Sequence, residues 1–137
     1  MTYTFLEHTA DVKFKAEAKT LEEAFILSAE ALNETIYGKI KILEQEEKTI
    51  EIEGKDLEGL LYNFLEEFLF LLDSEDFLVS KVKEIKIDQE KFKLHAKLLG
   101  DKSEKYNFTN DVKAITYNEM FVKQEENLWK TQVVLDV

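Results

Sequence analysis

The sequence has no cysteine, no proline and no arginine, and it contains only four glycines in 137 residues. The absence of cysteine excludes disulfide bonds, thiolate metal sites and a cysteine nucleophile, and it is typical of a reducing compartment. All 18 basic residues are lysine, so the bidentate guanidinium clamp for phosphate is missing. The longest uninterrupted apolar run, Phe68–Leu72, is far too short to span a bilayer. We therefore expect a protein that does not use a membrane.

Charge is abundant instead, and most of it is negative. The formal net charge is −11, which repels a phosphate backbone, so we expect no autonomous nucleic-acid binding. Basic proteins or cations are the partners that such a chain favours. The first residues, Met1-Thr2-Tyr3-Thr4-Phe5, lack the basic and apolar regions of a signal peptide, which predicts a cytoplasmic protein. The length predicts a single domain over residues 1–137.

The hydrophobic period changes several times along the chain, which is typical of an α+β fold. Thr20 and Glu23 form a capping box at the start of one helix that reaches Gly38, and Asp56 caps a second helix with a broad apolar face. The rest reads as strands, over residues 2–6, 12–18, 39–53, 79–87, 91–99, 112–123 and 128–136. We predict two layers, with a largely antiparallel sheet and two helices packed on one face. The last four strands are expected to form a meander.

Two aspartates, one near each end of the chain, are candidate metal ligands. Asp11 follows the first predicted strand, and Asp136 stands one position before Val137 at the end of the last. If the fold brings them together, these carboxylates and the Val137 carboxylate repel one another unless a cation or a shared proton relieves the charge. Oxygen donors favour a hard cation such as Ca²⁺ or Mg²⁺ over zinc. In the alternative reading, Asp11 is a turn residue and Asp136 an ordinary terminal acid.

Three further residues have both a functional and a structural interpretation. His8 lies beside the first acidic motif and is a base, a ligand or a structural hydrogen-bond donor. Lys113 shares a strand face with apolar neighbours, where its stem packs and its amine reaches water, a phosphate or a partner carboxylate. Glu67 falls on the flank of the second helix's apolar face and either points into solvent or projects into a site or an interface. The scattered glycines form no phosphate loop, and no nucleophile–base pair stands out.

Five segments together resemble the archease family of accessory proteins of the tRNA-splicing RNA ligase. No single one is decisive, but all five occur in order from the first predicted strand to the last residue. The segments are Tyr3-Thr4-Phe5-Leu6-Glu7-His8-Thr9-Ala10-Asp11-Val12, Lys19-Thr20-Leu21-Glu22-Glu23-Ala24-Phe25, Asp56-Leu57-Glu58-Gly59-Leu60-Leu61-Tyr62-Asn63-Phe64-Leu65-Glu66-Glu67, Val112-Lys113-Ala114-Ile115-Thr116-Tyr117 and Val133-Val134-Leu135-Asp136-Val137.

The resemblance implies a function that spacing alone does not give. Archeases promote guanylylation of the ligase's active-site histidine and so permit multiple turnover in tRNA splicing, while the ligase performs the covalent chemistry. The chain is then a non-enzymatic activator with a divalent metal, calcium or alternatively Mg²⁺ or Mn²⁺, at Asp11, Asp136 and a Val137 oxygen. Lys113 matches the family's lysine and is expected at the ligase interface or near its nucleotide, Glu67 occupies a family-like acidic position, and Asn118 departs from a histidine often found there. The alternatives are a stand-alone metal-dependent phosphoesterase and a non-activating, chaperone-like binding module.

Overall fold

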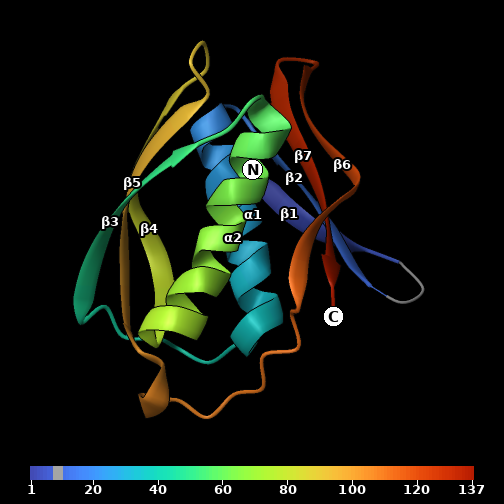
Figure 1. The fold of residues 1–137 in the computed structure, drawn as a ribbon. Helices are drawn as coiled ribbons and strands as arrows, with labels where there is room; N and C mark the ends of the chain where they lie inside the picture. The colour runs from blue at the N-terminus through green and yellow to red at the C-terminus, as the bar shows by residue number, and fades with distance from the viewer. Residues whose placement is uncertain (8–10) are drawn as a thin grey trace.

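The computed structural model describes residues 1–7 and 11–137, and it contains two long helices, one short 3₁₀ turn and seven strands (Figure 1). In chain order these are β1 (Thr2–Leu6), β2 (Val12–Ala18), α1 (Leu21–Tyr37), β3 (Glu46–Glu53), α2 (Leu57–Glu75), β4 (Phe77–Asp88), β5 (Lys93–Lys102), η1 (Ser103–Lys105), β6 (Ala114–Glu125) and β7 (Leu128–Asp136). Among the described residues, no helix combines the length and the apolar character needed to cross a membrane.

The strands form two antiparallel sheets, with both helices between them (Figure 1). The four-stranded sheet has the order β1-β2-β7-β6, and the three-stranded sheet has the order β3-β5-β4. Each helix contacts both sheets: α1 packs on β2, β7, β1 and β4, and α2 packs on β6, β4, β3 and β5. The helices therefore form the middle of the molecule.

This arrangement confirms the predicted α+β class with two helices and antiparallel strands, and it corrects the number of sheets. The expected meander is divided, because β4 and β5 pair in one sheet while β6 and β7 pair in the other. Alternation along a strand shows which side chains face inward, but it does not identify the neighbouring strand. The buried residues of both helices are numerous enough to need cover on more than one side.

An aromatic cluster joins the two helices at the centre of the core. The rings of Phe25 and Phe64 stack with centroids 5.9 Å apart, and Phe64 meets Phe68 edge-on at 5.2 Å. Phe14 of β2 is fully buried and belongs to the same core. Loss of one such ring would cost about 3–5 kcal/mol of unfolding free energy, so this cluster fixes how the helices hold the two sheets.

Both predicted helix starts are confirmed by their caps. The Thr20 hydroxyl accepts a hydrogen bond from the Glu23 backbone N–H at 3.1 Å, and Asp56 Oδ1 accepts one from Gly59 at 2.6 Å. Caps of this kind contribute about 1 kcal/mol each. The first helix ends at Gly38, whose φ of 68° suits a residue without a side chain. The second helix ends at Glu75, and Asp76 follows it in the left-handed conformation.

The strand predicted over residues 39–53 is shorter than expected, because only Glu46–Glu53 pairs with a neighbour. The preceding residues are held by side chains instead of a ladder. The backbone N–H of Leu43 donates to the Tyr106 hydroxyl at 3.0 Å, and that hydroxyl donates to the buried carboxylate of Asp101 at 2.7 Å. Because distant side chains fix this irregular segment, its sequence shows no hydrophobic period that would distinguish it from a strand. Strand β5 also continues past the predicted end at residue 99 and reaches Lys102, so that it includes Asp101.

Candidate functional site

The two ends of the chain meet at one edge of the four-stranded sheet. Strands β2 and β7 pair antiparallel with Val12 opposite Leu135, so one further step along this register sets Asp11 opposite Asp136. The buried residues Phe14 and Val133 alternate with these positions, which puts both aspartates on the face directed away from the helices. Residues directly opposite in an antiparallel pair have Cβ atoms about 4.5–5.5 Å apart. The folded chain thus brings together the two acids that the sequence singled out.

Lys113 lies on the other side of β7 at the same edge. Its backbone N–H donates to the Asp136 carbonyl at 2.7 Å, and the next residue, Ala114, pairs with Asp136. This bond uses the main chain of Asp136 in the ladder and leaves its exposed carboxylate to face outward. Lys113 falls on the opposite, helix-facing side of the strand row, beside Val137, which packs partly against the core. The Lys113 side chain is exposed, and its contact with the acidic pair is the backbone hydrogen bond to Asp136.

An ion pair on the outer face, which sequence reasoning missed, lies next to the acids. Lys13 follows Asp11 by two residues on the same face, and its amine is 3.1 Å from a carboxylate oxygen of Glu119. Glu119 adopts a φ of 55° within an irregularity where β6 leaves its regular pairing with β7. At this bulge the side-chain amide of Gln132 donates a hydrogen bond to the Glu119 carbonyl at 2.8 Å. No period in the sequence indicates a bulge of this kind.

The donors at this edge fit a hard cation. Two carboxylates and backbone oxygens are the ligands that Ca²⁺ and Mg²⁺ prefer. Across residues 1–7 and 11–137, no cluster of three or more His, Asp or Glu side chains suited to a metal occurs. With only two aspartates at this edge, a cation there would need water or a partner's oxygens to complete its coordination. His8, the third residue predicted near this edge, lies outside the described residues.

Glu67 does not join the other candidates. It lies with Lys48, Glu51 and Glu75 around a depression between α2 and β3, on the side of the three-stranded sheet. Partial burial, followed by the charges of Glu75 and Glu66, raises the pKa of the Glu67 carboxyl. Any contribution of Glu67 to function would thus act through a different surface from that of Asp11 and Asp136.

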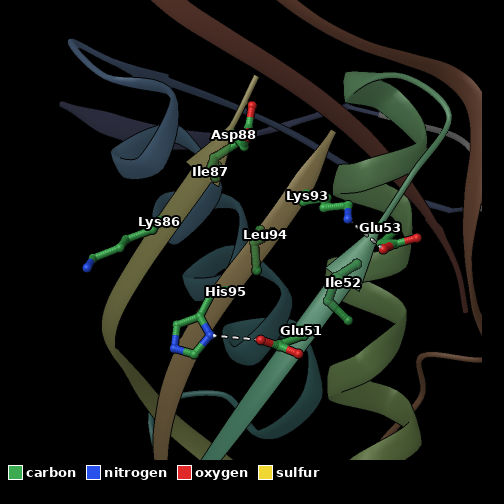
Figure 2. Close-up of a pocket in the computed structure, with 9 residues that line it drawn as sticks. All are labelled: Glu51, Ile52, Glu53, Lys86, Ile87, Asp88, Lys93, Leu94 and His95. Atoms are coloured by element: carbon green, nitrogen blue, oxygen red, sulfur yellow. Dashed lines mark ion pairs between the residues drawn. The ribbon is translucent and has the colours of Figure 1, made fainter. Parts of the chain in front are cut away.

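A second depression, of about 580 Å³, lies on the three-stranded sheet where β3 and β4 end and β5 begins (Figure 2). Figure 2 shows two ion pairs here: His95 Nδ1 is 3.5 Å from Glu51 Oε1, and Lys93 Nζ is 3.4 Å from Glu53 Oε1. His95 also stands opposite Lys86 on its other flank. Charges of opposite sign thus face each other between β3 and β5. This pattern is typical of a solvated sheet face.

The fold and this edge define a class: a small α+β protein in which a layer of two helices separates two antiparallel sheets and the chain's two ends supply an acidic pair. The model of the archease protein family (MTH1598/TM1083) matches residues 3–137. The chain belongs to the archease family.

Relatives and solved structures agree with this assignment. "Protein archease" of Pyrococcus abyssi is 43% identical over 136 residues, covering 96% of this chain and 95% of the relative. That of Pyrobaculum neutrophilum is 39% identical over 139 residues, covering 98% and 95%. The solution structure of Methanobacterium thermoautotrophicum protein 1598 superposes with a TM-score of 0.82 at 35% identity, covering 98% of both chains. A Thermotoga maritima crystal structure described as an archease and possible chaperone has a TM-score of 0.63 at 18% identity, covering 96% of this chain and 94% of its own, and supports the fold alone.

Proposed function

We propose that the protein is an accessory protein of the tRNA-splicing RNA ligase, which promotes guanylylation and multiple turnover of that enzyme. A divalent cation, calcium in the first instance, is held by Asp11, Asp136 and a Val137 oxygen. The observation that carries the proposal is the β2–β7 register, which aligns Asp11 with Asp136 in a member of the archease family. The covalent chemistry belongs to the ligase, and this chain acts as its non-enzymatic activator.

Charge explains how an acidic edge serves a ligase. Like charges directly opposite each other across a sheet are unfavourable, so Asp11 and Asp136 gain from a cation or from a basic surface placed between them. A ligase must be basic to hold RNA, and the net charge of −11 favours encounter with it. In this mechanism the edge docks at the ligase and positions a cation there, while Lys113 contacts the ligase or its nucleotide. His8 adjoins the edge in sequence, and Glu67 is assigned to a separate contact.

The test is a reconstituted guanylylation assay of the ligase, with and without this protein. Asp11→Asn and Asp136→Asn remove the charges and keep the side-chain shapes, and each is expected to abolish the stimulation. Asp73→Asn is a matched control, because it removes an exposed acid from α2, away from the edge. Calorimetric titration with Ca²⁺ should show a loss of affinity of more than about tenfold in the two edge variants, since even outer partners of metal ligands contribute about 10–100-fold.

The remaining outcomes separate the alternatives. Phosphoester turnover by the purified chain without a ligase would identify a metal-dependent phosphoesterase. Binding to the ligase without stimulation would identify a chaperone-like module, as the wording used for the Thermotoga maritima protein suggests for that protein. Full stimulation by both edge variants would exclude the acidic edge as the working surface.

A further inference from the structure

A third depression, away from the acidic edge, forms a cavity between β1, the C-terminal half of α1 and β4. Its volume is about 190 Å³, and its polar lining comes from Tyr3, Glu30, Asn33, Glu34, Tyr37 and Ser80. It does not include Asp11, Lys113 or Asp136, and neither the sequence analysis nor the proposed function uses it.

Asn33 is the first sign that the cavity is a site. Four polar side chains are buried in the described part of the chain, namely Ser28, Asn33, Asp101 and Thr131. Ser28 and Thr131 bond each other at 2.8 Å, and Asp101 accepts from Tyr106. Asn33 is only 6% exposed, and its amide has no hydrogen-bond partner within residues 1–7 and 11–137. A buried amide without a partner costs about 1–3 kcal/mol, so a group that enters the cavity and satisfies it is favoured.

The hydroxyl groups of the cavity define what that group must supply. Tyr37 donates its proton to the Val79 carbonyl at 3.0 Å, and Ser80 donates to the Ile42 carbonyl at 2.9 Å. Burial, followed by the charges of Glu34 and Glu30, raises the pKa of the Tyr3 hydroxyl, so that hydroxyl stays neutral. The hydroxyl protons of Tyr37 and Ser80 are therefore committed, and what these two oxygens offer to an occupant is lone pairs. An occupant has to bring hydrogen-bond donors.

Negative charge selects a cationic donor. Glu34 is already paired with Lys39 at 3.0 Å, whereas Glu30 forms no ion pair with any residue that the structure describes. Partial burial raises the pKa of the Glu30 carboxyl. The charge of Glu30 also reaches the ring of Tyr37, whose pKa burial raises to about 12. Tyr37 therefore stays neutral, and its ring can lie beside a cation.

We propose that this cavity binds a primary alkylammonium group, with Glu30 as its counter-charge and the Asn33 carbonyl and the hydroxyl oxygens as acceptors. An ammonium has three donors and one positive charge, which matches this set. A phosphate or carboxylate finds mostly acceptors here and is disfavoured. A bare divalent cation would need six to eight oxygens and several carboxylates, but only Glu30 is unpaired. The alkylammonium comes either from a free polyamine or from a lysine side chain of a protein partner.

Titration of the full chain tests the proposal without any ligase. We expect n-butylammonium and spermidine to shift the NMR signals of residues 30–37 saturably, while n-butanol, which lacks the charge, does not. Glu30→Gln should lower the affinity about tenfold or more, because it removes the charge from a partly exposed position and leaves the fold intact. Glu23→Gln, two turns earlier on the same helix, is the matched control and should bind as the unchanged chain does. Equal binding by Glu30→Gln, or no saturable shift, overturns the proposal.

Asn33→Leu supplies a readout that a merely structural asparagine would not give. If the amide lacks a partner, its replacement by a leucine of similar length should raise the thermal midpoint of the free protein and abolish the further rise that amines produce. A lower midpoint together with undiminished amine binding contradicts the proposed role of Asn33. A lysine peptide and its acetyllysine form separate the two sources: discrimination between them supports a protein partner, and spermidine binding alone supports a free polyamine.

Discussion

The two sheets differ in which charged residues stand opposite each other on neighbouring strands. Across the three-stranded sheet, Glu53 faces Lys93 and Glu51 faces His95, so that an acid stands opposite a basic residue in both pairs. At the edge of the four-stranded sheet, Asp11 and Asp136 follow Val12 and Leu135 on facing strands, and two like charges meet. Unlike cross-strand pairs contribute about 0.2–1 kcal/mol each, while like charges directly opposite are destabilising. One sheet thus sets acids opposite basic residues, and the other sets two acids opposite each other at its edge.

The nearest lysine makes the contrast sharper. Lys13 lies on the same face as Asp11, where it could have neutralised the acidic pair, but its amine is bonded to Glu119. A bulge and a residue with positive φ are needed to bring Glu119 across the sheet to this position. The fold therefore contains a counter-ion close to the acids and engages it with another carboxylate.

The largest effect should come from turning the edge into a copy of the other sheet. Asp11→Lys places unlike charges opposite each other, so we expect cation binding and ligase stimulation to be abolished while the free energy of unfolding rises. Calcium calorimetry, the guanylylation assay and urea unfolding measure the three quantities. Lys15→Glu, on the same strand face but two residues further from the edge than Lys13, is the control and should leave cation binding intact. Loss of stability in Asp11→Lys would show that the acidic pair does not repel.

The sequence predicted the acidic edge only in part, for reasons that particular residues make clear. Alternation put Asp11 and Asp136 at strand ends, and the antiparallel register of β2 with β7 then brought them together. The resemblance to archeases supplied the expectation of a shared site. Glu67 and Glu66 differ by one position on a helix, and their sequence pattern could not tell which strand each faces. The Asn33 cavity was missed because an asparagine within an apolar stripe is normally satisfied, and its missing partner is visible only in three dimensions.

Asp101 provides the next largest effect, because it is a buried acid that is fully compensated. The Tyr106 hydrogen bond, together with Lys105 and the Lys102 N–H, lowers its pKa below the ordinary value of 3.8 against the opposing effect of desolvation. A lowered pKa means that this stabilisation is present above the unfolded-state value and is lost as the pH falls through the folded-state value. Asp101→Asn should therefore be less stable at pH 7 and show a flatter loss of stability below about pH 4. Thermal unfolding between pH 2 and 7 measures this; Asp73→Asn is the control, and parallel curves would contradict the assignment.

A smaller effect is expected when the three-stranded sheet is given the charge arrangement of the acidic edge. Lys93 stands between Glu53 of β3 and Asp88 of β4, so Lys93→Glu sets three acids in one row. We expect a loss of about 1 kcal/mol in the free energy of unfolding at low salt. The loss should shrink in 1 M NaCl, where the Debye length is about 3 Å. Urea unfolding at both salt concentrations measures it, Lys91→Glu in the adjacent turn is the control, and ligase stimulation should not change. A loss that persists in high salt would mean packing, and not charge, fixes Lys93.

The smallest effect is expected at Glu67, which decides whether the two sheets also divide the function. Desolvation raises its pKa, so its charged form destabilises the fold, and this cost appears as the pH rises through the folded-state value. Glu67→Gln should therefore be slightly more stable at pH 7 and should keep full calcium affinity, because the carboxylate faces β3 and not the acidic edge. Glu66→Gln is the comparison, since Glu66 is the exposed neighbour of Glu67 on α2. Reduced ligase stimulation at unchanged calcium affinity would make Glu67 a partner contact on the second surface, whereas reduced calcium affinity would contradict the separation of the two surfaces.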